Sequence, residues 1–459
     1  MAIEAVEFAS TLPVSAEEAY AWHGRPGAFE RLIPPWAPVR VIEQSGDLAH
    51  REVILEAVIG PVRRRWVTKT LGAVPGRQFM DQHTGGPFAR WLHTRLFEPV
   101  DQTRCRCVDR IEYQLPFGAA GSLAGGWVRR SLERVLRYQH TTLSHDLHAH
   151  QRFSAQGSRT ILMTGATGLV GRGLLCYLTA GGYRVRRLVR RQPGPDDLRW
   201  DPAGGQLESA GLQGVDAVVH LAGESIAGGR WTAAHRRRVM ESRTKGTALL
   251  ARALAQLPRP PRVLVSASAI GIYGDHGQEV LTEQAPLRVE GEAGFLERVA
   301  QAWEAATAPA EQAGIRVIRL RMGMVLTPAG GALEKMLPPF RAGLGGRLGN
   351  GRQYVSWIAI DDVVGSIHHA ILTESITGPV NATAPEPVTN AELTATLSRV
   401  LSRPSLLPVP AAVLRAVFGT MAEELLLAST RVIPERLQAS GYPFRFPAVE
   451  GALRHVLGR

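Results

Sequence analysis

Hydrophobic residues beyond position 159 fall into short runs that are separated by segments of helical periodicity. This alternation is typical of an α/β domain in which helices cover both faces of a doubly wound parallel sheet. The predicted strands cover residues 160–164, 184–189, 217–221, 263–266 and 317–320.

The first 150 residues carry a different pattern. A long helix is predicted at about residues 127–148, because Leu132, Leu136, Leu143 and Leu147 lie on one of its faces. Strand-like stretches precede it at residues 51–58, 67–71 and 104–113. The pattern predicts an antiparallel α+β domain whose sheet packs around one long helix.

A polar segment at residues 151–158 separates the two patterns. We therefore predict one domain at residues 1–150 and a second at residues 159–459. The length of 459 residues agrees with this division, since domains average roughly 150 residues.

The formal net charge of +12 raises the question of a nucleic-acid partner. The basic residues are nearly all arginines, however, and they are spread along the chain instead of clustering. We therefore expect no nucleic-acid partner, while attraction of an anionic small molecule remains open. The three cysteines form neither a disulfide framework nor a zinc spacing, so no metal site is expected.

The amino terminus lacks a basic targeting region, and no apolar run reaches the ~18 residues that a membrane span requires. The sequence therefore predicts a cytoplasmic protein without a membrane partner.

A glycine-rich turn follows the first strand of the second domain. The strand at residues 160–164 leads into Gly165, Gly168 and Gly171, and an apolar helix follows. Gly165 permits a tight turn, Gly168 lets the backbone approach a pyrophosphate, and Gly171 lets the helix pack closely on the strand. The helix amino terminus then faces an anion. Together with Thr167 and Leu169, these glycines form the predicted cofactor-binding turn.

The second strand ends in Arg190 and Arg191, about twenty residues after the turn. An NAD-specific protein places an acid there for the ribose 2′-hydroxyl, whereas a guanidinium binds a 2′-phosphate. We therefore expect NADP(H) as the cofactor, with NAD as the alternative. The other interpretation is that both arginines are solvated surface residues, since this chain is rich in arginine.

From these residues onward the chain resembles the extended, epimerase-like branch of the short-chain dehydrogenase/reductases. The resemblance covers residues 159–459, and it is to nucleoside-diphosphate-sugar epimerase-like oxidoreductases. It implies a small carboxy-terminal region from about residue 380. It implies that Leu221, Ala222 and Gly223 back the cofactor at the end of the fourth strand. It also implies cofactor contact for Ser266 and a catalytic role for Ser268 on the fifth strand.

The superfamily's Tyr-x-x-x-Lys pair is missing, because its expected positions hold Leu296 and Ala300. Three alternatives follow. Tyr273 could supply the proton, the domain could bind its ligands without turnover, or Glu297 could act as an unusual acid. The resemblance also points to Arg321, Gln353 and Trp357 as substrate candidates, although Trp357 could simply fill the core. Arg230 is a fourth candidate because it lies on the loop after the fourth strand, where it could meet an anionic substrate or only the solvent.

Residues 1–150 resemble the START-like or polyketide-cyclase-like (SRPBCC) helix-grip superfamily, on stretches such as 29–36 and 86–91. The resemblance implies a cavity for a hydrophobic ligand between the sheet and the helix. Two functions remain open for the whole chain. One is an oxidoreductase for a carbonyl or sugar-nucleotide-like substrate, and the other is a non-catalytic NADP(H)-binding regulator that senses a hydrophobic ligand.

Overall fold

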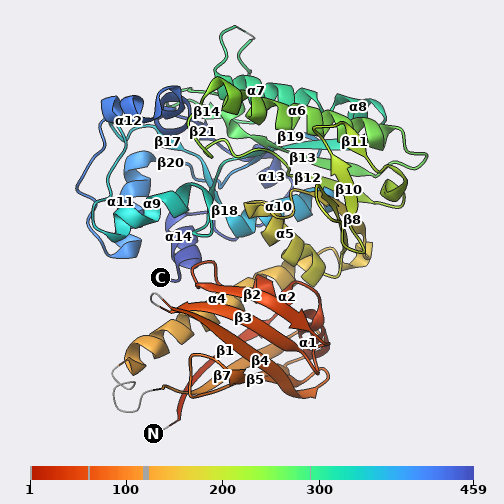
Figure 1. The fold of residues 1–459 in the computed structure, drawn as a ribbon, viewed down its shortest axis with the longest axis vertical. Coiled ribbons are helices and arrows are strands. Elements are labelled where there is room, and N and C mark those ends of the chain that lie inside the picture. Colours follow the sequence, from red (N-terminus) through yellow and green to blue (C-terminus); the bar gives the residue numbers. More distant parts are fainter. Residues whose placement is uncertain (1–2, 60–61, 117–123, 290) are drawn as a thin grey trace. The chain divides into compact units, whose positions relative to one another are not determined.

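The computed structural model describes residues 3–59, 62–116, 124–289 and 291–459 (Figure 1). It divides the chain into two compact units. The first comprises residues 1–158 with 176–182 and 458, and the second comprises residues 159–175, 183–457 and 459.

The first unit is a seven-stranded antiparallel sheet with a long helix along one face (Figure 1). Its elements are β1 (Glu4–Leu12), α1 (Ala16–Gly24), α2 (Ala28–Arg31), β2 (Val39–Ser45), β3 (Glu52–Ile59), β4 (Val62–Val74), β5 (Gln78–Gly85), β6 (Arg90–Pro99), β7 (Cys105–Gln114) and α4 (Gly125–Gln151). The strand order is β1-β7-β6-β5-β4-β3-β2.

The apolar face of α4 holds this unit together. Leu132 and Leu136 pack against Val6, Trp91 and Ile111 of the sheet. The predicted helix and the antiparallel sheet around it are therefore confirmed. The sequence pattern missed β1, β2, β5 and β6, because their polar outward positions interrupt the apolar signal.

The second unit is an eight-stranded sheet in the order β11-β10-β9-β8-β12-β13-β15-β19. Its strands are parallel except for β11, which pairs antiparallel with β10. The sheet strands are β8 (Thr160–Thr164), β9 (Arg184–Val189), β10 (Leu198–Asp201), β11 (Gln206–Leu207), β12 (Ala217–His220), β13 (Val263–Ala269), β15 (Arg316–Met322) and β19 (Gly378–Ala382).

Helices cover both faces of this sheet, with α6, α7 and α8 on one side and α5 and α10 on the other (Figure 1). They are α5 (Leu169–Ala180), α6 (Ala233–Ala255), α7 (Phe295–Ala305), α8 (Ala308–Gln312) and α10 (Ile360–Leu372). All five predicted strands are present, so the doubly wound fold is confirmed. Within the described ranges, no helix combines the length and apolarity of a membrane span.

The remaining short strands and helices lie outside the main sheet. They are η1 (Ser154–Gln156), η2 (Ala210–Leu212), η3 (Ile270–Ile272), β14 (Val280–Leu281), β16 (Met324–Leu326), α9 (Gly331–Arg341), β17 (Tyr354–Val355), β18 (Trp357–Ala359), β20 (Val388–Thr389), α11 (Asn390–Leu401), α12 (Ala411–Phe418), η4 (Ala422–Leu427), β21 (Arg431–Val432), α13 (Glu435–Ala439) and α14 (Val449–Leu457).

Candidate cofactor site

The strand order reverses at β8, which lies between β9 and β12. The chain passes from β8 through α5 to β9 on one side, and it later returns as β12 on the other side. In open α/β sheets such a reversal leaves a crevice beyond the carboxyl ends of the strands, where ligands bind. The glycine-rich turn begins at this position, directly after Thr164.

The glycines fit the turn for the reasons that their sequence spacing predicted. Gly165 has a φ of +69°, and a Cβ there would lie 2.7 Å from the carbonyl carbon of Leu221. A Cβ on Gly171 would lie 2.1 Å from the carbonyl oxygen of Gly165. Thr167 and Gly168 are exposed just before α5. The first amides of that helix, from Leu169 onward, have no acceptor one turn back within the helix, so they can bind an anion.

Thr164 fixes the opposite wall of the crevice. Its hydroxyl oxygen accepts hydrogen bonds from the amides of Leu221 and Ala222, over 3.1 and 3.2 Å. The same hydroxyl lies 2.8 Å from Nδ1 of His220, whose Nε2 lies 3.0 Å from the Thr247 hydroxyl. Burial lowers the pKa of His220 to about 4, so this imidazole is neutral and structural.

Arg190 and Arg191 are exposed at the carboxyl end of β9. Other arginines of this strand are paired, since Arg184 binds Asp196 and Arg187 binds Asp197, each over 2.7 Å. Arg190 and Arg191 form no ion pair within the described part of the chain. Their guanidinium groups are therefore available for a ligand at the edge where a 2′-phosphate would lie.

A buried polar network lies at the carboxyl ends of β13 and β15. Ser268 donates a hydrogen bond to Glu304 over 2.7 Å, and Arg321 grips the same carboxylate from Nε and a terminal nitrogen over 2.8 and 2.9 Å. The other terminal nitrogen of Arg321 donates to the Tyr273 hydroxyl over 2.8 Å. That hydroxyl donates in turn to Asn381 over 2.8 Å.

This network changes the interpretation of both predicted catalytic residues. Tyr273 is fully buried, and burial raises the pKa of its hydroxyl in spite of Arg321. Its hydroxyl and that of Ser268 are both engaged with protein groups. Leu296 and Ala300 are also buried, so the described structure places an apolar surface where the superfamily carries its tyrosine and lysine. Ser266 is buried within β13.

Three of the four substrate candidates have structural partners. Arg321 is bound to Glu304 and Tyr273, as described above. The amide of Gln353 donates to the carbonyl oxygens of Leu348 and Leu426. Trp357 is fully buried, and its indole donates to the carbonyl of Glu386. Each of these three placements favours the structural alternative, whereas Arg230 is exposed.

Glu297 also has a structural role. It is buried at the start of α7, where its carboxylate accepts a hydrogen bond from the amide of the N-cap residue Gly294 over 2.5 Å. This structural role argues against the interpretation of Glu297 as a catalytic acid.

Arg243 is a residue that the sequence reasoning missed. It lies in α6, and its guanidinium carbon would be 3.3 Å from a Cβ on Gly223. It donates to the carbonyl of Glu224 over 2.9 Å and lies 4.9 Å from the ring centre of Trp303. Burial lowers its pKa to about 10, which still leaves it charged at neutral pH. No local sequence signal separates this arginine from the many surface arginines nearby.

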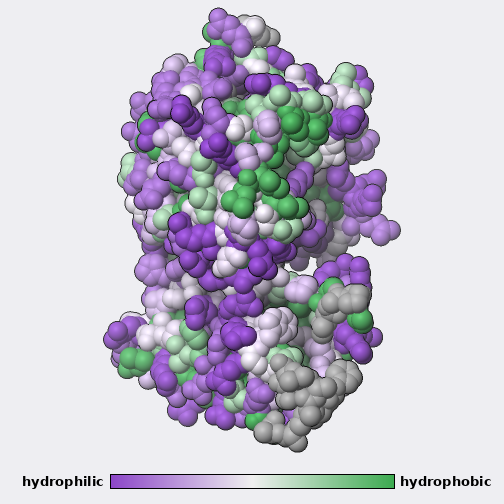
Figure 2. All heavy atoms as spheres, turned by 90° about the vertical axis from the view of Figure 1, so that its left-hand side faces the viewer, coloured by the Kyte–Doolittle hydropathy of each residue, from purple (hydrophilic) through white to green (hydrophobic). Residues whose placement is uncertain are grey.

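Exposed apolar side chains gather on the face that carries α11 and α12, where Figure 2 shows groups of hydrophobic residues in green. The large exposed apolar residues of the carboxy-terminal region are Leu406, Leu407, Val413, Val417, Phe418 and Leu425. Grouped exposure of this kind is typical of surfaces that contact other molecules.

Three family models match parts of the chain. The NAD dependent epimerase/dehydratase family matches residues 161–382. The family of polyketide cyclases, dehydrases and lipid transport proteins matches residues 12–138, and a domain of unknown function matches residues 409–456.

Related proteins cover one or both units. An epimerase family protein of Mycobacterium bovis is 41% identical over 300 residues, which cover 65% of this chain and 98% of the relative. A crystal structure of a nucleoside-diphosphate sugar epimerase from Corynebacterium glutamicum has a TM-score of 0.80 and 33% identity, and the match covers 99% of this chain and 90% of that one. The human epimerase family protein SDR39U1, crystallised with NADPH, has a TM-score of 0.59 and 36% identity, covering 65% and 99%.

Proposed function

Because this chain belongs to the NAD dependent epimerase/dehydratase family, we propose that its second unit binds NADP(H) and acts on a carbonyl or sugar-nucleotide-like substrate. One observation carries the cofactor choice: Arg190 and Arg191 are exposed and have no ion-pair partner in the described chain, at the end of the strand beside the glycine turn. The NADPH in the human relative supports the same choice.

Different residues of the crevice bind different parts of the cofactor. The amides that follow Gly168 at the start of α5 bind the pyrophosphate, which can approach the backbone because Gly168 has no side chain. Leu221 and Ala222 form the facing wall, held in place by Thr164. Arg190 and Arg191 bind the 2′-phosphate through charge-assisted hydrogen bonds. When bound, the nicotinamide supplies or accepts a hydride.

Turnover also requires a group that gives or takes a proton at the substrate oxygen. Ser268 is the residue that matches the superfamily pattern, but its hydroxyl donates to Glu304 in this structure. A substrate oxygen that replaces this carboxylate as the acceptor would receive the serine hydrogen bond. Catalysis therefore requires that the hydrogen bond from Ser268 to Glu304 breaks, so that the serine hydroxyl can donate to the substrate.

A second function is favoured by the same network. Since the hydroxyls of Ser268 and Tyr273 are both engaged within the protein, the unit could bind NADP(H) without turnover and act as a regulatory or scaffold module. This alternative predicts the same cofactor affinity but no conversion of any substrate.

The first experiment is calorimetric titration of the full chain with NADPH and, separately, with NADH. We expect NADPH to bind at least tenfold more tightly, because NADH lacks the group that Arg190 and Arg191 hold. Equal affinities would contradict the 2′-phosphate assignment, and binding of neither would contradict the cofactor site. Nicotinamide absorbance in the presence of aldehydes and ketones, together with product analysis after incubation with sugar nucleotides, then separates the enzyme from the regulator.

A further inference from the structure

A small pocket lies inside the first unit, and it is separate from the nucleotide crevice of the second unit. Its volume is about 80 Å³. Since an ordered water needs at least about 10–15 Å³, the pocket holds roughly six waters, or an organic molecule of a similar number of atoms. Its lining combines apolar and ionisable side chains: His23, Ala28, Phe29, Leu32, Ile33, Arg51, Phe79, Asp81, His93, Arg95 and Gln139.

Two arginines line this pocket, and one of them is fully paired. Arg95 is buried and donates to both oxygens of Asp109, over 2.6 and 2.8 Å. It also lies 2.6 Å from Nε2 of His23 and donates to Gln139 over 3.2 Å. Its charge and its donors are therefore satisfied by the protein.

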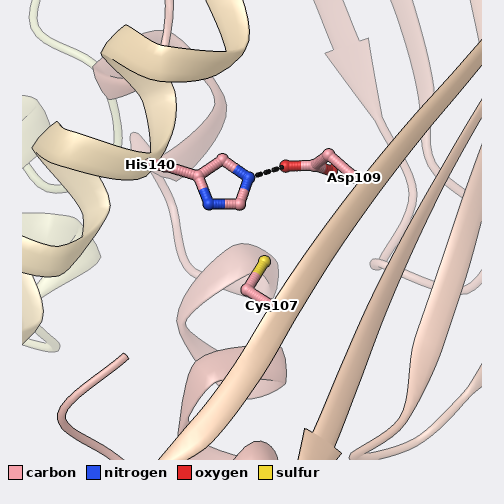
Figure 3. A group of neighbouring side chains, drawn as sticks. All are labelled: Cys107, Asp109 and His140. Carbon is pink, nitrogen blue, oxygen red and sulfur yellow. Dashed lines mark hydrogen bonds and ion pairs between the residues drawn. The ribbon is translucent and has the colours of Figure 1, made fainter. Parts of the chain in front are cut away.

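Asp109 is equally saturated. Besides Arg95, it contacts Nε2 of His93 and Nε2 of His140, each over 2.7 Å. Figure 3 shows the contact with His140. Although burial raises the pKa of Asp109, Arg95 and the two histidines hold it well below its usual range. Cys107 and His140 lie close enough to Asp109 to share a metal ion. However, the carboxylate already has four donors, and burial raises the pKa of the Cys107 thiol, so this cluster does not suit a cation.

Arg51 differs from Arg95 because it is underpaired. It is only 5% exposed, and one terminal nitrogen donates to the carbonyl of His23 over 3.2 Å. The other forms an ion pair with Asp81 at 3.6 Å, which is beyond hydrogen-bond range. Its Nε has no acceptor among the described residues. The rings of Phe29 and Phe79 hold the guanidinium at 5.4 and 5.7 Å from their centres. A buried cation with unused donors is costly, so an anion in the pocket would stabilise it.

We propose that this pocket binds a small monocarboxylic acid. Its carboxylate accepts hydrogen bonds from Arg51, and its apolar part lies against Phe29, Leu32 and Ile33. A monoanion fits better than a phosphate dianion, because Asp81 beside Arg51 contributes a second negative charge. The pocket is also far smaller than the roughly 300–1,000 Å³ typical of sites for drug-sized ligands, which excludes a long lipid from it.

The test is calorimetric titration of the full chain with butyrate and benzoate, and with the neutral benzamide as the matched control ligand. We expect one of the acids to bind and benzamide to bind at least tenfold more weakly. The variant Arg51→Met should lose at least tenfold in affinity for the acid. Arg63→Met should keep the affinity of the wild type, because Arg63 is 74% exposed on β4 of the same unit.

A second variant guards against a folding defect in Arg51→Met, which thermal unfolding would reveal. Ile33→Trp fills the pocket from its partly exposed wall and leaves Arg51 intact. We expect it to abolish binding of the acid. Binding of neither acid, equal binding of benzamide, tighter binding of inorganic phosphate, or unchanged affinity in either pocket variant would overturn the proposal. None of these outcomes depends on the nucleotide site.

Discussion

Ser268 donates a hydrogen bond to Glu304 over 2.7 Å, and Arg321 binds the same carboxylate from the neighbouring strand. The side chains of Glu304 and Arg321 are 11% and 5% exposed, so the ion pair is largely removed from water. Burial by itself lowers the pKa of Arg321, but the hydrogen bond and the ion pair with Glu304 raise it above its usual value. The charges of this pair therefore depend on each other.

Removal of either charge from the pair of Glu304 and Arg321 should destabilise the folded protein. We expect Glu304→Gln to lower the free energy of unfolding by about 3–5 kcal/mol, because it leaves the buried Arg321 without a counter-charge. Glu311→Gln is the matched control, since Glu311 is 50% exposed in its pair with Arg319 and should contribute less than about 1 kcal/mol. Urea denaturation measures both. Equal effects of the two substitutions would show that the inner pair contributes no more than a surface pair.

Two glycines of α5 offer a direct test of the cofactor turn. Gly171→Ala should destabilise the second unit and abolish NADPH binding, because the new Cβ would lie 2.1 Å from a backbone oxygen. Gly173→Ala is the control in the same helix, where the nearest atom would be 3.5 Å away on the Val364 side chain. We expect it to be neutral or to stabilise by up to about 1 kcal/mol. Retained NADPH affinity in Gly171→Ala would count against the placement of the site.

The arginines at the end of β9 should decide between the cofactors. We expect Arg190→Ala to weaken NADPH at least tenfold and to leave NADH unchanged, because only NADPH has the 2′-phosphate. Arg184→Ala, on the same strand and 67% exposed, should change neither affinity. Titration of both cofactors measures the effect. An equal loss for NADH would mean that Arg190 supports the turn instead of the phosphate.

His220 should make the second unit less stable in mild acid. Its pKa is about 4 in the folded protein and about 6.5 when unfolded, so the unfolded chain binds more protons between these values. His220 therefore makes its full contribution to the free energy of unfolding above about pH 6.5. As the pH falls toward 4, the free energy of unfolding decreases by roughly 3 kcal/mol on this account. We expect His220→Gln to show a correspondingly flatter pH dependence in urea unfolding. Parallel wild-type and variant curves would contradict this.

Much of the fold could be predicted from the sequence, because its signals are local. The five core strands of the second unit are short apolar runs, and the glycine turn needs backbone conformations that glycine adopts easily, such as the φ of +69° at Gly165. The long helix α4 follows from the spacing of Leu132, Leu136 and their neighbours. These features depend on residues that are close in the chain.

Only the tertiary structure decided which side chains from distant parts of the sequence form hydrogen bonds and ion pairs with one another. Ser268 matches the superfamily's serine and Tyr273 is the phenol nearest to it in the sequence, yet Glu304, Arg321 and Asn381 bind their hydroxyls from other elements. The same holds in the first unit, where packing pairs Arg95 with Asp109 and leaves Arg51 underpaired. Sequence spacing determines which backbone shapes are accessible, but the protonation and availability of a side chain depend on burial and on neighbours that only the folded chain brings together.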